Sequence, residues 1–206
     1  MALTAERIGE GIAWLAACDP RLAEVVRRVG PPPPRPRPRG LEGLLRAIVT
    51  QQISARAAEG IWKRLRERAD PSDPEALLAL GPEGLRQVGF SRAKAAYALG
   101  LAAQVADGRI RLEALPVDDE AAIALLMSIK GLGRWSAEIY LLFAEGRPDV
   151  LPAGDLALRV EAARILDARE RLSERALRAH AERWRPYRGV AAFLLWHARS
   201  AQPQAG

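Results

Sequence analysis

Residues 125–143 read LLMSIKGLGRWSAEIYLLF, which is two apolar segments joined by Gly131-Leu132-Gly133. Apolar residues recur in both segments at three- and four-residue intervals, and this spacing predicts two helices. Glycine allows a tight turn with positive φ, and the apolar Leu132 can pack between the two helices. The stretch therefore predicts a helical hairpin.

The turn of this hairpin suits a phosphate group. Without side chains, the glycines leave backbone amides accessible at the start of the second helix, where the helix dipole also attracts an anion. Lys130 and Arg134 add positive charge on either side of the turn. Such a contact holds a nucleic-acid backbone without reading its bases. For these residues alone, the alternative is an ordinary hairpin whose glycine ends a helix.

Outside the hairpin, the sequence pattern is helical almost throughout. Similar apolar spacing appears in residues 41–53, 55–65, 93–105 and 121–129, and no alternating strand pattern competes with it. Residues whose side chains cap helix N-termini precede four predicted helices, namely Ser54, Asp73, Ser91 and Ser173. Pro186 is expected to begin the last helix. The sequence thus predicts an all-α fold.

The composition describes a globular chain with a polyanionic partner. Of 206 residues, 49% are hydrophobic and 27% are charged, and the formal net charge is +6. Clustered cations gain affinity for phosphates by releasing counterions, so this charge favours nucleic acid. Cys18 is the only cysteine, which excludes an intramolecular disulfide, a cysteine-rich zinc site and a four-cysteine iron–sulfur cluster. With neither a leader pattern nor a membrane-length apolar run, we expect a cytoplasmic protein that binds no membrane.

Residues 31–40 read PPPPRPRPRG and interrupt the helical pattern. Proline lacks an amide donor and clashes with the preceding helical turn, so this stretch predicts a stiff connector. We favour a linker between an N-terminal helical pair and the rest of the chain. The alternative is an arginine-bearing arm that touches DNA.

Four further blocks indicate the family to which the hairpin belongs. They are residues 44–54 (LLRAIVTQQIS), 89–97 (GFSRAKAAY), 148–159 (PDVLPAGDLALR) and 184–196 (WRPYRGVAAFLLW). With the hairpin, they resemble the helix-hairpin-helix (HhH-GPD) DNA glycosylase superfamily, and more closely its 3-methyladenine DNA glycosylase II (AlkA-type) branch. The resemblance covers roughly residues 41–200, in order and at similar spacing.

The resemblance implies a two-lobed helical fold with the active cleft between the lobes. One lobe is expected to span residues 41–144 and to contain the hairpin. The other is expected to span residues 145–206 and to carry a catalytic aspartate. Residues 1–40, the N-terminal helices and the proline-rich connector, are expected to join this second lobe.

The function that the resemblance implies is base excision repair. The chain would be a monofunctional glycosylase that flips alkylated bases, of the 3-methyladenine and 7-methylguanine type, out of double-stranded DNA and hydrolyses their N-glycosyl bonds. It would act as a monomer without a nucleotide cofactor. The alternatives are a non-catalytic helix-hairpin-helix module that binds DNA, and a glycosylase for another damaged base, such as oxidised guanine or mismatched adenine.

In this family, the loop after the hairpin ends in an aspartate that starts the next helix, and here that residue is Asp155. A carboxylate near C1′ stabilises the positive charge that develops on the sugar as the base departs. Taken alone, Asp155 is read as the N-cap of a helix that begins at Leu156. The two roles are compatible. Direct stabilisation of an oxocarbenium-like state and orientation of a water molecule both remain open.

The resemblance also implies a tryptophan-lined substrate pocket. Trp135 stands where bifunctional relatives carry a Schiff-base lysine, so the enzyme is expected to hydrolyse the bond without cutting the strand. Trp135 and Trp196 would stack on a cationic base. Ile139 stands where an enterobacterial relative has tyrosine, which implies a wider and less electron-rich pocket. The other tryptophans are expected in the core, and they are Trp14, Trp62 and Trp184.

Further contacts with DNA are implied at the helix end before Ser54. Gln51 would reach the pocket, and Gln52 would be the wedge that fills the gap left by the flipped nucleotide. A solvated glutamine pair is the alternative. At the hairpin, the implied DNA contacts are Lys130, Gly131, Gly133, Arg134 and Ser136. No cofactor is expected apart from a sodium or potassium ion held by backbone carbonyls of Met127, Ile129 and Leu132.

Overall fold

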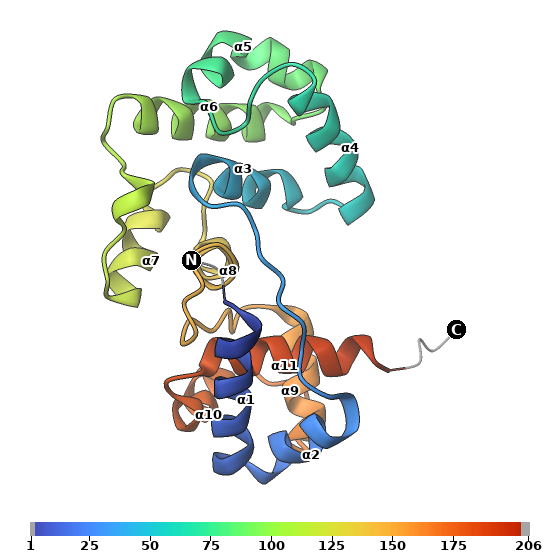
Figure 1. Cartoon of the computed structure of the whole chain (residues 1–206). Coiled ribbons are helices and arrows are strands. Elements are labelled where there is room, and N and C mark those ends of the chain that lie inside the picture. The colour runs from blue at the N-terminus through green and yellow to red at the C-terminus, as the bar shows by residue number, and fades with distance from the viewer. Residues whose placement is uncertain (1–2, 203–206) are drawn as a thin grey trace. The chain divides into compact units, whose positions relative to one another are not determined.

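The computed structural model describes residues 3–202, and the regular structure in this range is helical with no strand (Figure 1). The all-α prediction is therefore confirmed. The α-helices are α1 (Ala5–Cys18), α2 (Pro20–Val29), α3 (Gly40–Thr50), α4 (Ala55–Arg66), α5 (Pro74–Gln87), α6 (Arg92–Ala106), α7 (Asp119–Met127), α8 (Arg134–Phe143), α9 (Leu156–Ile165), α10 (Glu174–Ala181) and α11 (Arg188–Ser200). Two short 3-10 helices are η1 (Leu112–Ala114) and η2 (Glu182–Trp184).

The predicted helix starts are confirmed at all four capping residues. Each side chain accepts a hydrogen bond from a backbone amide in the first helical turn, which satisfies a group that the helix itself leaves unpaired. These caps are Ser54 on α4, Asp73 on α5, Ser91 on α6 and Ser173 on α10. The predicted start of the last helix is wrong, because α11 begins at Arg188 rather than at Pro186. Tyr187, with φ −123° and ψ 31°, is still outside helical geometry.

The chain divides into two compact units. Residues 37–140 form the hairpin unit, and residues 3–36 with 141–202 form the aspartate unit. The predicted boundaries, after residues 40 and 144, lie four residues later than the observed ones, after 36 and 140. At the first boundary, the Gly40 amide donates a 2.9 Å hydrogen bond to the Tyr140 hydroxyl, which ties the end of the connector to the hairpin unit.

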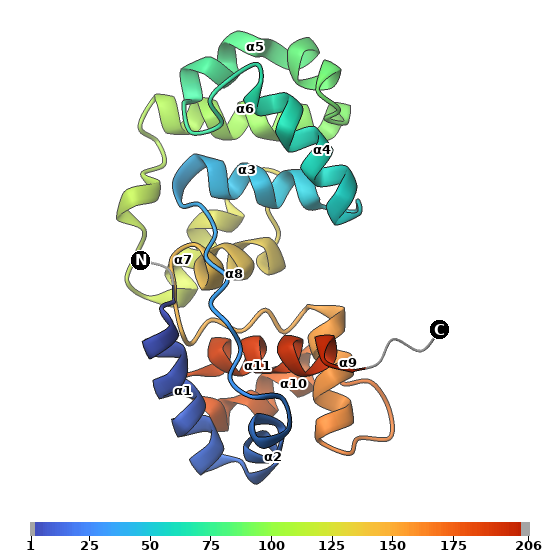
Figure 2. The same ribbon diagram turned by 45° about the vertical axis from the view of Figure 1, so that its right-hand side comes forward.

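The core of the hairpin unit forms where α6 packs against α5 and α3 (Figure 2). The largest of its fully buried side chains are mostly leucine, and burying one leucine contributes roughly 1.5 to 3 kcal/mol. Among them are Leu44, Leu45, Ile48, Leu65, Leu77, Leu85, Leu101 and Leu126. Helix α5 contains a kink at Gly81, where φ is +63°, directly before Pro82. Proline cannot continue the hydrogen bonding of the preceding turn, so the kink separates two helical segments.

The aspartate unit is built around α11, which packs against α1, α2 and α9. Trp184 is fully buried, and its indole nitrogen donates a 3.1 Å hydrogen bond to Asp19, the N-cap of α2. Trp62, in the hairpin unit, is also buried, as predicted. The prediction for Trp14 is wrong, because this side chain is 38% exposed and its ring lies 6.0 Å from that of Tyr187.

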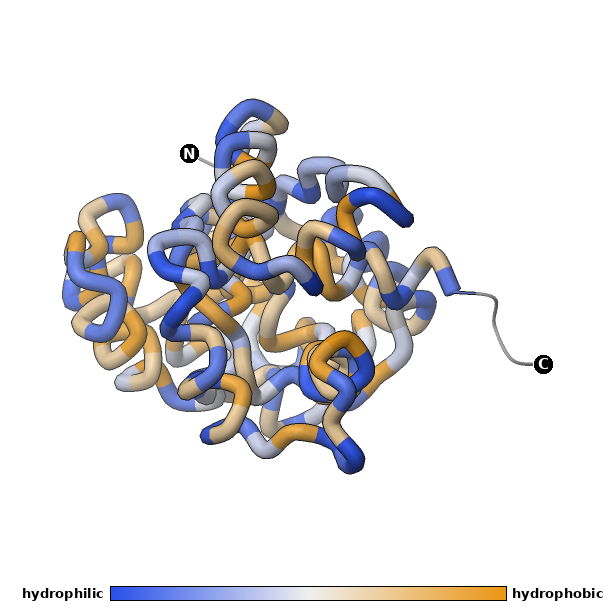
Figure 3. Tube along the Cα trace, turned by 90° about the horizontal axis from the view of Figure 1, so that it is seen from below, coloured by the Kyte–Doolittle hydropathy of each residue, from blue (hydrophilic) through white to orange (hydrophobic). Residues whose placement is uncertain are grey.

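Hydrophobic and hydrophilic residues are interspersed along each helix (Figure 3). This is the pattern of helices that bury one face. Residues 30–39 form no helix, so the prediction that the proline-rich segment cannot be helical is confirmed. Within residues 3–202, no helix combines the length and apolarity needed to cross a membrane.

Candidate functional site

The predicted hairpin turn joins α7 to α8. The Leu132 amide donates to the Ile129 carbonyl at 3.1 Å, and the Ala137 amide donates to the Gly133 carbonyl at 3.1 Å, which starts α8. Leu132 is buried, as the apolar residue between two glycines predicts. The turn is therefore held by its own backbone and by one apolar side chain.

The two glycines of the turn have different physical requirements. Gly131 has φ +95°, and a Cβ atom there would lie 2.4 Å from the ring of Tyr97. Gly133 is exposed, and a Cβ atom there would meet nothing within 4 Å. Gly131 thus fits the turn against α6, whereas Gly133 leaves the start of α8 open to an approaching ligand.

The charged residues beside the turn are not equivalent. Lys130 is exposed. Arg134 forms ion pairs within the hairpin unit, at 2.5 Å with Glu120 and at 2.9 Å with Glu138. These partners, Glu120 foremost, raise the pKa of Arg134 above its usual value. Ser136 is buried, so its hydroxyl group offers little surface to DNA, and its role stays a prediction.

The predicted wedge segment, Gln51-Gln52, directly follows α3, and Gln51 contacts the hairpin turn. The side-chain amide of Gln51 donates a 2.9 Å hydrogen bond to the Gly131 carbonyl. Gln52 is exposed and has φ +55°, which is uncommon for any residue other than glycine. The structure therefore brings Gln51 to the hairpin, with Gln52 in an unusual backbone conformation beside it.

One residue of this region, Lys94, is not among the site residues predicted from sequence. Lys94, on α6, is half-buried, and its ammonium group donates to the carbonyls of Val49 at 2.7 Å and Gln51 at 2.6 Å. Burial lowers the pKa of Lys94. The only signal in the sequence is its position in the 89–97 block, because the contact joins residues more than 40 positions apart.

Helix α8 carries two of the predicted pocket residues. Trp135 lies in its first turn and is 39% exposed, while Ile139, one turn later, is buried at 6% exposure. Met127, one of the predicted cation ligands, is exposed at the end of α7. Trp135 thus has aromatic surface available for stacking, whereas little of Ile139 is accessible.

In the aspartate unit, Asp155 is half-buried at the start of α9. Its Oδ1 atom accepts hydrogen bonds from the Leu158 amide at 3.0 Å and from the Trp196 indole nitrogen at 3.3 Å. A turn closed by the Asp155 amide and the Pro152 carbonyl, 2.9 Å apart, precedes it. The N-cap reading of Asp155 is therefore confirmed, and the same carboxylate is oriented by a second predicted site residue.

Aromatic residues surround the indole of Trp196. The ring of Phe143 lies 5.5 Å from it, and the ring of Phe193 lies 6.3 Å from it and 4.8 Å from Phe143. Edge-on and tilted aromatic pairs at these separations are mutually stabilising. The two phenylalanines therefore help to hold the indole that contacts Asp155, and neither is among the site residues predicted from sequence.

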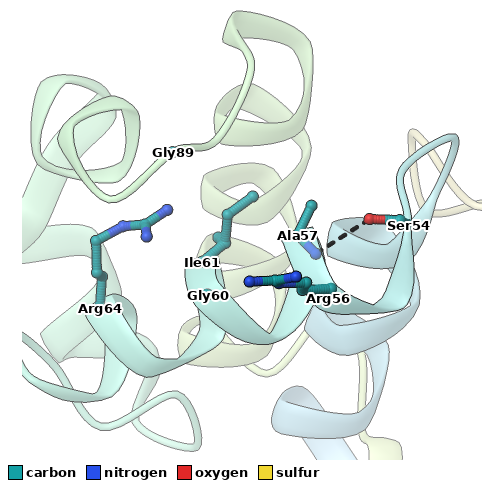
Figure 4. A pocket seen from close by; sticks show the side chains of 7 residues that line it. All are labelled: Ser54, Arg56, Ala57, Gly60, Ile61, Arg64 and Gly89. Atoms are coloured by element: carbon teal, nitrogen blue, oxygen red, sulfur yellow. Dashed lines mark hydrogen bonds between the residues drawn. The ribbon is translucent and has the colours of Figure 1, made fainter.

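A basic hollow of about 520 Å³ lies where α4 begins, soon after the wedge segment. Figure 4 shows Arg56 and Arg64 beside it, with Gly89 on the opposite wall. Nε of Arg64 donates to the Val88 carbonyl at 2.9 Å. Two exposed guanidinium groups make the hollow electropositive, and a phosphate oxygen is a ligand that suits them.

The predicted site residues fall into two groups, one in each unit. The hairpin unit contains Gln51, Gln52, Met127, Ile129, Lys130, Gly131, Leu132, Gly133, Arg134, Trp135, Ser136 and Ile139, and the aspartate unit contains Asp155 and Trp196. Within residues 3–202, no three His, Cys, Asp or Glu side chains gather where they could hold a metal ion.

Known proteins resemble the chain in sequence and in structure. Residues 45–186 match the family model described as HhH-GPD superfamily base excision DNA repair protein. DNA-3-methyladenine glycosylase 1 of Schizosaccharomyces pombe is 33% identical over 161 residues, which cover 75% of this chain and 70% of that protein. A DNA-3-methyladenine glycosidase from Bacillus halodurans superposes with a TM-score of 0.84 at 31% identity, covering 93% of this chain and 89% of that one. The S. pombe 3-methyladenine DNA glycosylase Mag1, solved in complex with abasic DNA, gives 0.80 at 30% identity, with coverage of 91% and 95%.

Proposed function

This chain belongs to the HhH-GPD superfamily of base excision DNA repair proteins, and on that premise we propose that it is a monofunctional DNA glycosylase for alkylated bases. The substrates would be of the 3-methyladenine and 7-methylguanine type in double-stranded DNA. The relatives named above as 3-methyladenine glycosylases support this substrate class.

The observation that carries the proposal is the environment of Asp155. The Leu158 amide and the Trp196 indole hold its carboxylate in one orientation at the start of α9. During hydrolysis, the bond between C1′ and the base nitrogen breaks, the cationic base leaves with the electron pair as a neutral molecule, and water adds to C1′ and releases one proton to solvent. A fixed carboxylate stabilises the positive charge that the sugar develops, and it needs no reorganisation to do so.

Aromatic surface supports the choice of alkylated bases. A base methylated on a ring nitrogen is cationic, and an aromatic face attracts a cation by roughly 0.5 to 2 kcal/mol. Trp135 exposes more than a third of its side chain, and the Trp196 indole is held by Phe143 and Phe193. Stacking on either tryptophan would favour cationic bases over neutral ones.

A monovalent cation at the hairpin is a further part of this proposal. Backbone carbonyls of Met127, Ile129 and Leu132 would hold it. The Ile129 carbonyl already accepts the Leu132 amide, and it fits this additional role because a carbonyl oxygen has two lone pairs. When bound, the ion would supply positive charge for a DNA phosphate at a turn whose own Arg134 is ion-paired.

The proposal is tested with oligonucleotides that each contain one lesion, with base release and strand cleavage measured separately. We expect release of the alkylated base, and strand breaks only after alkali, because Trp135 cannot form a Schiff base with C1′. Borohydride should therefore trap no covalent complex. Trapping would contradict the monofunctional assignment and direct attention to Lys130. Binding without base release from any substrate would instead indicate a non-catalytic DNA-binding module.

The phosphate contact predicts a second result. Gly133→Asp should weaken binding to damaged and undamaged duplex alike by about tenfold or more, because it places a negative charge at an exposed position of the turn. Binding is measured by fluorescence anisotropy. Gly133→Ala is the control, since its Cβ atom meets nothing within 4 Å. Unchanged affinity in a folded Gly133→Asp protein would remove the hairpin from the account of DNA binding.

A further inference from the structure

The turn that carries Gln52 has the backbone geometry of a type II turn. Gln51 has φ −57° and ψ 128°, and Gln52 has φ +55°. A type II turn favours glycine at the second of these positions, because φ must be positive there. A type I turn, in which both φ angles are negative, would relieve this strain. The two turns differ by a flip of the peptide between the two glutamines.

Lys94 donates a hydrogen bond to the Gln51 carbonyl, which this peptide flip would move. Its ammonium group lies 2.6 Å from the Gln51 oxygen and 2.7 Å from the Val49 oxygen. Both oxygens belong to the C-terminal end of α3, where a cation is also favoured by the helix dipole. If the Gln51 carbonyl turned away, the half-buried ammonium group would lose one of its two partners.

The same face of α6 also contacts the hairpin. Tyr97 packs against Gly131, and the Gly131 carbonyl accepts the side chain of Gln51. Lys94 lies one helical turn before Tyr97. Helix α6 therefore holds the wedge segment through Lys94 and the hairpin turn through Tyr97. Gln51 links the wedge segment to the hairpin turn.

We propose that Lys94 is a positioning residue for base extrusion, because it holds the peptide between Gln51 and Gln52 in the orientation that presents Gln52 as a wedge. The inference rests on the proposed glycosylase function. Lys94 itself touches neither the base nor the sugar in this scheme. It acts through Gln52, and its loss should matter only where the wedge is needed.

The test compares two duplexes that contain 7-methylguanine, one with the lesion opposite cytosine and the other with it opposite an abasic-site analogue. An unpaired lesion needs less energy for extrusion. Under single-turnover conditions, Lys94→Met should slow base release by about tenfold or more on the paired duplex and by less than about threefold on the unpaired one. Lys63→Met is the matched control, because it removes one exposed lysine from the same unit, and it should change neither rate.

A double-mutant cycle separates positioning from general support. If Lys94 acts through Gln52, then Lys94→Met combined with Gln52→Ala should be no slower on the paired duplex than Gln52→Ala alone. Equal slowing on both duplexes, additive effects in the cycle, or no slowing at all would each overturn the proposal. Lys94→Gln, which is neutral but polar, replaces Lys94→Met throughout if the methionine variant does not fold.

A fluorescent reporter keeps this test independent of catalysis. With 2-aminopurine next to the lesion, extrusion unstacks the reporter and raises its fluorescence. Wild-type protein should give this rise, and Lys94→Met should give less than about half of it at saturating protein. An equal rise in both would overturn the role of Lys94. If wild-type protein releases no base but gives the rise, the glycosylase function fails while the role of Lys94 is still decided by the variant.

Discussion

Replacing Asp155 with asparagine is expected to slow single-turnover release of 7-methylguanine by at least about 100-fold, a loss of roughly 2.7 kcal/mol of transition-state stabilisation. Asparagine keeps the size of the side chain and an oxygen that can accept from both the Leu158 amide and the Trp196 indole. It removes the negative charge and replaces the second carboxylate oxygen with an NH2 group. Affinity for lesion-containing DNA, measured by anisotropy, should stay within about threefold of wild type.

The matched control for this variant is Asp73→Asn. Asp73 caps α5 through the Glu75 amide at 2.9 Å, as Asp155 caps α9, but it has no role in the proposed chemistry. Asparagine is as good an N-cap as aspartate, so this control should keep wild-type stability and activity. Near-normal base release by Asp155→Asn would show that Asp155 only caps α9 and would contradict the proposed mechanism.

Gly131→Ala is expected to destabilise the hairpin unit by about 3 kcal/mol and to abolish tight DNA binding. The added Cβ atom would lie 2.4 Å from the ring of Tyr97 and 2.9 Å from its Cβ atom, so rotation of the tyrosine ring cannot remove the overlap. The backbone at φ +95° adds strain for any residue with a side chain. Chemical denaturation monitored by circular dichroism measures the loss of stability.

Gly133→Ala provides the comparison for this prediction, because it makes the same chemical change two residues away in open space. It should unfold at nearly the denaturant concentration of the wild type. Similar losses in both variants would show that glycine is needed for flexibility of the turn rather than for packing against α6.

The local features of the fold were predictable from sequence because their causes lie within a few residues. Apolar spacing places the helices, and the hydroxyl or carboxylate before each start bonds an amide two or three residues later, as at Ser54 and Asp73. The hairpin turn follows from two glycines around Leu132. Asp155 could be chosen because a loop and a helix start surround it in the pattern of its family.

The features that sequence could not supply join distant residues. The bond from Trp196 to Asp155 spans 41 positions, and that from Lys94 to Gln51 spans 43. The ion pair of Arg134 with Glu120 also joins two different helices. Because of this pair, the positive charge of Arg134 beside the turn is already partnered within the protein. Trp14 was misplaced in the core because the spacing of a helix does not tell how deeply one edge of its apolar face is buried.

The pairing of Arg134 with two glutamates bears on how such a protein searches a genome. A cation already paired with carboxylates of the protein displaces few counterions from DNA, and counterion release is what makes binding strong and salt-sensitive. A turn that holds the backbone mainly through uncharged amides and a single exposed lysine would therefore hold undamaged DNA loosely. The protein would dissociate quickly from each undamaged position and would stay bound for longer only at a lesion whose base can be extruded.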